Sequence, residues 1–321
     1  MSNTLTYGPQ TTTDQLLEGQ NLAGKRILVT GASAGLGAET ARALAAHGAG
    51  VVMAVRDLAK GEQAAAAMRA AAAPNASVEL RELDLASLSS VRACADQLLA
   101  EGAPLNVLIA NAGVMACPQG TTQDGFETQF GTNHLGHFVF VNRLVPLLIA
   151  GAPSRVVVLS SSGHRMSDVD LDDPGFERTP YDPWLAYGRS KTANALFALA
   201  LDSKLRDRGV RACAVHPGGI QTELGRHLTG ETMQLLMQHF PSPQGLRFKS
   251  VPEGAATSVW AAIIGNADEI GGRYCEDCGV AKLTDDPAAR SGVRAYAVDP
   301  QHAEVLWARS EDLVGERFPL Q

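Results

Sequence analysis

The sequence predicts a doubly wound α/β fold in a single domain, with helices flanking a parallel sheet. Short β-rich runs alternate with helical stretches along most of the 321 residues. The β-rich runs are continuously apolar rather than alternating, which is typical of strands buried on both faces. No Pro-, Gly- or Ser-rich linker and no internal repeat divides the chain. The alternation from end to end therefore favours one sheet over two separate domains.

Each predicted strand is followed by a predicted helix. The strands are expected at 26–30, 50–55, 77–81, 106–110, 154–160, 210–216 and near 272–275. The helices are expected at 34–47, 57–73, 87–100, in a long region that ends near 150, and at 183–208 and 252–265. The second helix is rich in alanine and ends at Pro74 and Asn75, which is an ordinary stop signal.

The two ends of the chain differ from this repeat. Residues 1–20 are polar and are expected to form an arm, and residues 21–280 are expected to form the α/β domain. Residues 281–321 are expected to be a tail that packs back on the same domain. The reason is a pattern typical of one amphipathic helix, made by Ala303, Leu306, Trp307 and Leu313.

The charge balance argues against polyanionic partners. The chain has 34 acidic and 27 basic residues, a net charge of −7, and no Lys/Arg run, whereas a nucleic-acid binder is usually basic somewhere. No apolar stretch approaches the roughly 18–20 residues that span a bilayer. The polar N-terminus lacks a signal pattern, and five cysteines are an odd number that suits reduced thiols. These features predict a cytoplasmic protein with no membrane span and no nucleic-acid partner.

A glycine-rich turn joins the first strand to the first helix. Residues 30–37 read TGASAGLG, with glycines at 31, 35 and 37. Glycines let the backbone turn tightly and approach a pyrophosphate, and the opening helix offers free N–H groups and a positive dipole end. The spacing is not GxGxxG, and a tight turn without a ligand would also use glycines. The place of the turn between a strand and a helix nevertheless favours a Rossmann-type dinucleotide site.

The end of the second strand bears on the choice between NAD and NADP. An NAD-binding strand usually ends in an acidic residue that binds the ribose hydroxyls, but this strand ends in Val55 and Arg56. Arg56 offers a forked donor for a 2′-phosphate, and Ser33 could add a hydroxyl. A solvated Arg56 that pairs with Asp57 is the alternative. The pattern favours NADP(H), with NAD(H) as the alternative cofactor.

A phenol and an ammonium share one face of a predicted helix, because Tyr187 and Lys191 are four residues apart. A tyrosine with a pKa near 10 is a poor base at neutral pH, but a nearby ammonium and an oxidised nicotinamide both favour its phenolate. Such a tyrosine can exchange a proton with a carbonyl or carbinol oxygen. Three hydroxyls, Ser160 to Ser162, follow the fifth strand at the edge where such sheets bind ligands. An exposed helix pair and a plain polar strand end are the structural alternatives.

These motifs together resemble the short-chain dehydrogenases/reductases. The motifs that occur in that family's order are residues 30–37, Asn111-Ala112-Gly113 after a strand, Ser161, the Tyr187/Lys191 pair and residues 216–218. The resemblance covers about residues 22–275 and implies that 21–280 is an NAD(P)-binding catalytic domain. Residues 124–127 (DGFE) and 132–138 (TNHLGHF) resemble a narrower, mostly NADP-linked branch. That branch contains retinol dehydrogenases, WW-domain oxidoreductases, light-dependent protochlorophyllide reductases and bacterial oxidoreductases.

The resemblance implies a role for each matching residue. It implies that Asn133 holds a water in a proton relay and that Ser161 orients the substrate oxygen. It also implies that Tyr187 is the general acid/base, and that Lys191 binds the nicotinamide ribose and lowers the Tyr187 pKa. The further implied cofactor contacts are Thr30, Gly31, Ser33, Gly35, Leu36 and Gly37 at the phosphates, Arg56 at the 2′-phosphate, Asp84 and Leu85 at the adenine, Asn111, Ala112 and Gly113 at the adenine ribose, and Pro217, Gly218, Ile220 and Thr222 at the nicotinamide.

The chain also departs from the family's pattern. The gap between Ser161 and Tyr187 is unusually long and carries an insert, residues 167–184, which is expected to edge the mouth of the site. Residues 233–237 (MQLLM) lie where the family carries a substrate-covering helix, although ordinary packing would use the same residues.

Two other groups of residues could suggest a metal, and we expect none. Cys275 and Cys278 form a single CxxC without a second ligand pair, so two ordinary thiols are expected. His134 and His137 are three residues apart on a predicted buried helix, where packing is the expected role.

The sequence therefore predicts an NADP(H)-dependent oxidoreductase that interconverts a secondary or primary alcohol and its ketone or aldehyde. An apolar substrate is expected, because the covering stretch is rich in Met and Leu. A non-catalytic NADP-binding sensor or interaction protein on the same fold is one alternative, and a reductase of carbon–carbon double bonds is another. The intact set of Asn133, Ser161, Tyr187 and Lys191 argues against the first, and Ser161 argues against the second. A homodimer, a homotetramer and a monomer remain open.

Overall fold

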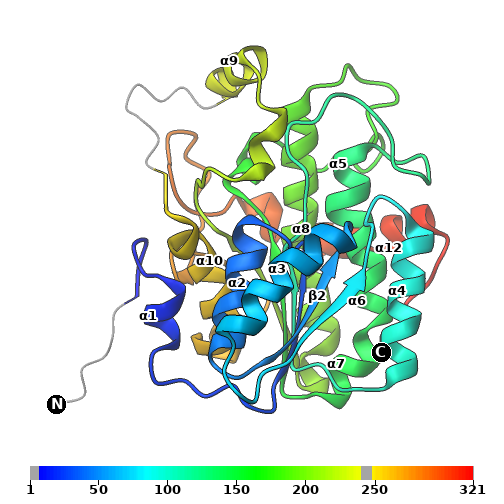
Figure 1. The fold of residues 1–321 in the computed structure, drawn as a ribbon. Helices are drawn as coiled ribbons and strands as arrows, with labels where there is room; N and C mark the ends of the chain where they lie inside the picture. The colour runs from blue at the N-terminus through cyan, green and yellow to red at the C-terminus, as the bar shows by residue number, and fades with distance from the viewer. Residues whose placement is uncertain (1–6, 240–247, 321) are drawn as a thin grey trace.

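A computed structural model describes residues 7–239 and 248–320 and contains an eight-stranded sheet (Figure 1). The strand order is β3-β2-β1-β4-β5-β6-β7-β8, and each neighbouring pair from β3 to β7 is parallel. Only the last pair, β7 and β8, is antiparallel. The order reverses between β1 and β4, and a doubly wound sheet binds its ligand at such a reversal. The predicted fold class is confirmed.

The strand bounds agree with the sequence prediction to within about two residues. They are β1 Arg26–Thr30, β2 Gly50–Val55, β3 Val78–Glu82, β4 Val107–Ala110, β5 Ser154–Leu159, β6 Val210–His216, β7 Tyr274–Glu276 and β8 Gly279–Val280. The edge strand β8 was not predicted, because two residues of pairing leave no apolar run to detect. Since β5 ends at Leu159, all three serines from Ser160 to Ser162 lie beyond the strand.

The helices alternate with the strands as predicted. They are α1 Thr13–Leu17, α2 Gly35–Ala46, α3 Leu58–Ala71, α4 Leu88–Glu101, α5 Thr128–Phe130, α6 Gly136–Arg143, α7 Val145–Ala150, α8 Pro183–Leu205, α9 Gly230–His239, α10 Val251–Val259, α11 Ala267–Ile270 and α12 Pro300–Val314. Side-chain N-caps fix several starts, for example Asp57 before α3 and Asp182 before α8. The long region predicted to end near 150 is broken by a π-helical turn, Gly131–Leu135.

Each face of the sheet carries its own apolar core. One core is built with α4, α6, α8 and α12, and the other with α1, α2, α3 and α10. Successive strand residues face opposite cores, as Ile27 and Leu28 do in β1. Figure 1 shows α2 and α3 in front of the sheet and α9 standing clear of the body at the top of the view.

Both ends of the chain pack on this domain. Leu16 and Leu17 of α1 are fully buried beside α2 and α10, so the described part of the expected arm belongs to the core. At the other end, the Trp307 ring of α12 lies 5.0 Å from the Phe138 ring and 5.9 Å from the Phe197 ring, between centroids. The tail from 281 onward thus covers α6 and α8.

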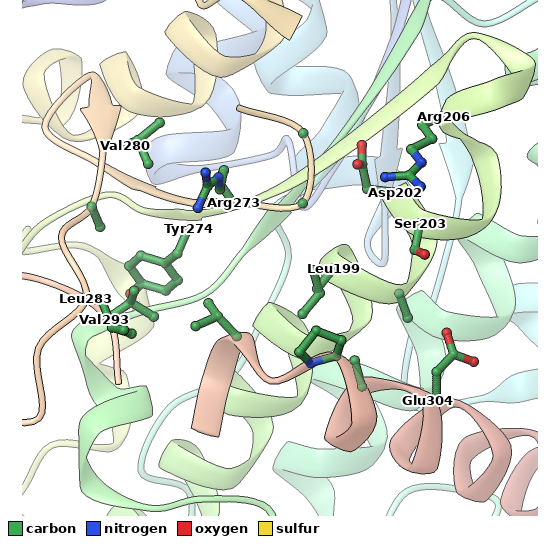
Figure 2. A pocket seen from close by; sticks show the side chains of 17 residues that line it. Leu199, Asp202, Ser203, Arg206, Arg273, Tyr274, Val280, Leu283, Val293 and Glu304 are labelled. Atoms are coloured by element: carbon green, nitrogen blue, oxygen red, sulfur yellow. The ribbon is translucent and has the colours of Figure 1, made fainter. Parts of the chain in front are cut away.

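A cavity of about 500 Å³ lies where α8, β7, β8 and α12 meet (Figure 2). Figure 2 shows Tyr274 and Val293 on one side of it and Asp202 and Arg206 on the other. None of the predicted site residues lines this cavity. Its size alone therefore does not make it the candidate site.

Candidate active site

The glycine turn after β1 has the geometry of a phosphate cradle. Gly31 and Gly35 have φ angles of +67° and +55°, which favour glycine. A Cβ on Gly37 would overlap the Gly31 carbonyl oxygen and lie 2.5 Å from Asn111 Nδ2. Helix α2 starts at Gly35, and no side chain caps its first N–H groups. Uncapped backbone donors beside a glycine-rich turn fit a pyrophosphate group.

The ends of β1 and β4 are joined by side chains of the predicted site. Thr30 Oγ1 accepts hydrogen bonds from the backbone N–H of Asn111 (2.9 Å) and of Ala112 (3.0 Å). Asn111 Nδ2 returns a bond to the Thr30 carbonyl oxygen at 2.8 Å. A Cβ on Gly31 would lie 2.9 Å from Ala112 Cα, so the two segments touch. The structure therefore brings residues 30–37 together with residues 111–113.

The side chain of Arg56 points into solvent just beyond β2. Its guanidinium has no hydrogen-bond or ion-pair partner among the residues that the structure describes. The expected alternative, a pair with Asp57, is not found, because Asp57 Oδ1 accepts from the Lys60 N–H as the cap of α3. Arg56 is thus available to an anion at the end of β2.

The two predicted adenine contacts follow β3. Leu85 is buried and packs against α6, where a Cβ on Gly136 would lie 2.5 Å from the Leu85 carbonyl oxygen. Asp84 Oδ1 accepts a hydrogen bond from the Ala86 N–H.

The loop after β6 turns back toward the glycine turn. Thr222 lies 3.4 Å from where a Cβ on Gly35 would be. A Cβ on Gly254 would meet Ile220 at 2.5 Å and Leu36 at 2.9 Å, so these two side chains close over the same spot. The structure thus brings Ile220 and Thr222, the predicted nicotinamide contacts, next to the glycine turn. Ser33 and Pro217 lie within these same two loops.

His216 holds this loop to the end of β5. Its Nδ1 lies 3.2 Å from the Ser162 N–H nitrogen and 3.3 Å from the Gly218 nitrogen, so it accepts two backbone bonds. A cavity of about 210 Å³ beside it includes His216, Gly218 and Lys249. The segments that follow β5 and β6 are therefore fixed to each other by one imidazole.

Tyr187 and Lys191 are both buried on α8, one turn apart. Lys191 Nζ lies 5.6 Å from the centroid of the Tyr187 ring and donates to the Leu159 carbonyl oxygen at 3.0 Å. The Tyr187 ring packs flush on Gly163, where a Cβ would lie 2.8 Å from two ring carbons. The position of the phenol is therefore set by a glycine in the turn after β5.

Of the three serines after β5, Ser161 is the one whose side chain lowers the pKa of the Tyr187 hydroxyl. Its Oγ also accepts the Gly163 N–H at 3.1 Å. Ser160 points elsewhere, because its hydroxyl donates to the Lys191 carbonyl oxygen at 2.7 Å. The geometry thus agrees with Ser161, rather than its neighbours, as the residue next to the reacting oxygen.

Asn133 lies in the π-helical turn and is fully buried. Its Oδ1 accepts the Val114 N–H (2.8 Å), and its Nδ2 donates to the Val114 carbonyl oxygen (2.9 Å) and to Ser190 Oγ (2.9 Å). A Cβ on Gly113 would lie 3.0 Å from Asn133 Oδ1 and 3.6 Å from Lys191 Nζ. A π-helical turn often marks a functional site, and here it brings Asn133 beside Lys191.

Burial dominates the charge state of the pair on α8. It raises the pKa of Tyr187 to about 12, although the hydrogen bond with Ser161 lowers that pKa in part. Burial lowers the pKa of Lys191 to about 8. Burial is thus the larger influence on Tyr187 in the chain alone, and the implied lowering of its pKa by Lys191 stays a prediction. The phenol is held protonated, and a positive charge from an oxidised nicotinamide would be needed to favour the phenolate.

An apolar mouth surrounds the Tyr187 ring. The side chains packed around it are Met115, Ala116, Met166, Trp184, Leu235 and Leu236. Leu235 and Leu236 come from α9, so the predicted covering stretch does lie over the site. Trp184 Nε1 donates to the Thr232 carbonyl oxygen at 2.6 Å and ties α9 to α8.

The sequence analysis missed Met115, Met166 and Trp184 as parts of this mouth. Trp184 could have been found, because it lies three residues before Tyr187 and so on the same helix face. The insert that ends at Trp184 is held to the mouth by Tyr181, whose hydroxyl donates to the Cys117 carbonyl oxygen at 2.9 Å.

The residues weighed as metal ligands have other roles. His134 Nε2 lies 2.8 Å from Ser310 Oγ, and His137 bonds to Thr30 and to the Asn133 carbonyl. Cys275 and Cys278 are buried free thiols. Across residues 7–239 and 248–320, no three His, Cys, Asp or Glu side chains come close enough to hold a metal ion. In the same part of the chain, no helix is both long and apolar enough to cross a bilayer.

Comparison with known proteins agrees with this geometry. Residues 25–232 match the family model of the short chain dehydrogenases. The chain belongs to the short-chain dehydrogenase/reductase family. Among its relatives, retinol dehydrogenase 14 of Homo sapiens is 41% identical over 304 residues, which are 91% of this chain and 87% of that protein. A short-chain dehydrogenase/reductase of Penicillium roqueforti is 41% identical over 293 residues, 89% of this chain and 84% of the other.

A solved structure supports the same family membership. The crystal structure of a Mycobacterium paratuberculosis protein has a TM-score of 0.70 and 38% identity, and the match covers 93% of this chain and 96% of that one. The short-chain dehydrogenase/reductase family consists of oxidoreductases that use a nicotinamide cofactor. The glycine turn, the uncapped start of α2 and the free Arg56 are this chain's own features that fit such a cofactor.

Proposed function

We propose that this short-chain dehydrogenase/reductase uses NADP(H) to interconvert an apolar alcohol and its ketone or aldehyde. One observation carries the proposal. Tyr187, whose hydroxyl is influenced by the neighbouring Ser161 side chain, lies within a cluster of apolar side chains and on the same helix as Lys191. The names of the retinol dehydrogenase relatives support an apolar alcohol as the substrate class. The cytoplasmic location expected from the sequence is part of this proposal.

The nicotinamide, when bound, supplies or accepts the hydride at the reacting carbon. In reduction, Ser161 and Tyr187 both donate hydrogen bonds to the carbonyl oxygen, and the Tyr187 proton passes to that oxygen as it becomes the hydroxyl. Oxidation reverses the transfer, and Tyr187 then takes the proton back. Because burial raises its pKa, the Tyr187 phenol rests in the protonated form, which is the form that reduction requires.

Lys191 serves the site through its charge and its position. Its Nζ is held at the Leu159 carbonyl and, because burial lowers its pKa to about 8, stays mostly protonated at neutral pH. That charge stabilises the phenolate left after Tyr187 donates its proton. The apolar mouth excludes water, which strengthens each of these interactions.

Substitution of Tyr187 tests the proposed reaction. Tyr187→Phe keeps the ring against Gly163 but removes the exchangeable proton. We expect turnover with apolar alcohols and ketones to fall at least about a hundredfold, since acid–base catalysis contributes about that much, while NADPH binding stays nearly unchanged. The measurement is NADPH absorbance across a substrate panel. Tight cofactor binding by the wild type without any turnover would instead favour the non-catalytic sensor.

Substitution of Arg56 tests the cofactor preference. Arg56→Ala removes the guanidinium that we assign to the 2′-phosphate. A hydrogen bond to a charged group contributes about 1.5–3 kcal/mol, so the NADPH dissociation constant should rise about ten- to a hundredfold and that of NADH should not change. Arg69→Ala on the following helix α3, where the Arg69 guanidinium pairs with Glu62, is the matched control. Equal losses for both cofactors would remove the 2′-phosphate assignment.

A further inference from the structure

We propose that His137 is a positioning residue that couples the cofactor-binding end of β1 to the catalytic Asn133, through a hydrogen-bond chain that can run in only one direction. This inference rests on the proposed function, because it concerns the same site. His137 lies on α6 and is fully buried. It reaches Thr30 with one ring nitrogen and the Asn133 carbonyl with the other.

The first step is a count of hydrogens at Thr30. A threonine hydroxyl has one hydrogen to donate and two lone pairs to accept with. Both lone pairs are used, by the N–H groups of Asn111 (2.9 Å) and Ala112 (3.0 Å). The third neighbour, His137 Nε2 at 2.9 Å, must therefore receive the hydroxyl hydrogen. Thr30 donates and His137 accepts.

The second step fixes the proton on the imidazole. Since Nε2 accepts, the ring hydrogen is on Nδ1, and Nδ1 donates to the Asn133 carbonyl oxygen at 2.9 Å. The opposite tautomer would set a lone pair against that carbonyl and a third donor against Thr30. The ring also stays neutral, because its pKa is lowered to about 4; burial is the main cause, the bond to Asn133 opposes it, and the charge of Lys191 adds to it.

The third step concerns the two parts of the site that this hydrogen-bond chain connects. Thr30 is the last residue of β1, immediately before the glycine turn, and it also fixes the 111–112 backbone. Asn133 is clamped at its side chain by Val114 and at its carbonyl by His137. A shift of the glycine turn on binding the cofactor would therefore reach the Asn133 carbonyl through a single ring. A neutral ring can do this without adding a second positive charge beside Lys191.

Two conservative variants separate the two ends of the ring. In His137→Gln, the side-chain oxygen can replace Nε2 as acceptor for Thr30, but the donor to Asn133 is lost. In His137→Asn, the side-chain nitrogen can replace Nδ1 as donor to Asn133, but the side chain no longer reaches Thr30. The first variant should therefore leave the NADPH dissociation constant unchanged and lower kcat about tenfold, which corresponds to about 1.4 kcal/mol.

His137→Asn should show the reverse pattern, with the NADPH dissociation constant raised about tenfold and kcat nearly retained. Thr30→Val breaks the same bond from the other side. It should weaken NADPH by a similar factor, and combining it with His137→Asn should add little. Dissociation constants are measured by fluorescence titration without substrate, and kcat with the best substrate from the panel.

His134→Gln is the matched control. His134 is equally buried, lies three residues earlier, and bonds to Ser310 on α12 instead of the site. This variant should change stability alone. Nitrogen NMR of histidine-labelled protein should show His137 protonated at Nδ1 and bare at Nε2, with its signals assigned by their loss in His137→Asn.

Several results would overturn the inference. If both His137 variants change kcat and the dissociation constant together, or neither, the ring only packs. Protonation at Nε2 in the NMR spectrum would reverse the chain and also refute it. Failure of the wild type to bind NADPH would contradict both the proposed function and this inference. Normal NADPH binding and turnover without the predicted split would remove this inference alone.

Discussion

Lowering the pH from 7 to about 4.5 should unfold the protein, because four histidines are held as neutral rings, three of them buried and His216 half-buried. Burial lowers the pKa to about 3 for His134 and His216 and to about 4 for His137 and His164. In the unfolded chain the pKa returns to about 6.5. A folded pKa below the unfolded one means that the stabilisation is complete above about pH 6.5 and is lost as the pH falls toward the folded pKa.

The size of the effect follows from these shifts. Each unit of pH below 6.5 costs about 1.36 kcal/mol for a ring that is protonated only when unfolded, which is about 2 kcal/mol per ring at pH 5. Four rings together lose about 8 kcal/mol, and a typical domain is stable by only about 5–15 kcal/mol. Buried Glu127 and half-buried Glu276 have raised pKa values, so protonation in acid relieves part of the cost of burying their charges and offsets some of the loss of stability.

Urea unfolding at several pH values measures this directly. Between pH 6 and pH 5 the free energy of unfolding should fall by about 5 kcal/mol per pH unit, which corresponds to uptake of nearly four protons. The variant His134→Gln should take up about one proton fewer. A free energy that stays flat between pH 7 and pH 5, or uptake of fewer than two protons, would mean that the rings are not buried and neutral, and would refute the hydrogen-bond directions drawn from them.

Two further predictions concern the turn and the mouth. Gly37→Ala places a methyl group against the Gly31 carbonyl and Asn111, so it should cost about 1–3 kcal/mol of stability and weaken NADPH binding at least about tenfold in titrations. Gly8→Ala, which has open space around the added methyl group, should change neither quantity. Unchanged NADPH affinity in Gly37→Ala would count against the phosphate cradle. Trp184→Phe removes the 2.6 Å hydrogen bond to the Thr232 carbonyl but keeps a ring beside Tyr187. Since one such bond contributes about 1 kcal/mol, amide hydrogen exchange in α9 should become about fivefold faster, and KM for bulky substrates should rise by a similar factor. Unchanged exchange in that variant would show that α9 is held by other contacts.

Local patterns in the sequence predicted most of the fold. Continuous apolar runs marked seven of the eight strands, and the glycine turn and the Tyr187/Lys191 spacing marked the two functional regions. These signals are short-range, because helix periodicity, strand burial and turn chemistry act over a few residues. The π-helical turn at Asn133 and the two-residue β8 escaped, since each depends on packing against distant segments.

The sequence by itself determined that this is a doubly wound α/β protein, and it predicted which residues carry its chemistry. Only the tertiary structure decided that α1 joins the core. It also decided that the phenol has a raised pKa, because burial is a property of the whole fold and outweighs the charge one helical turn away. The direction of the Thr30–His137–Asn133 chain was likewise decided there, because three segments far apart in sequence must meet before their hydrogens can be counted.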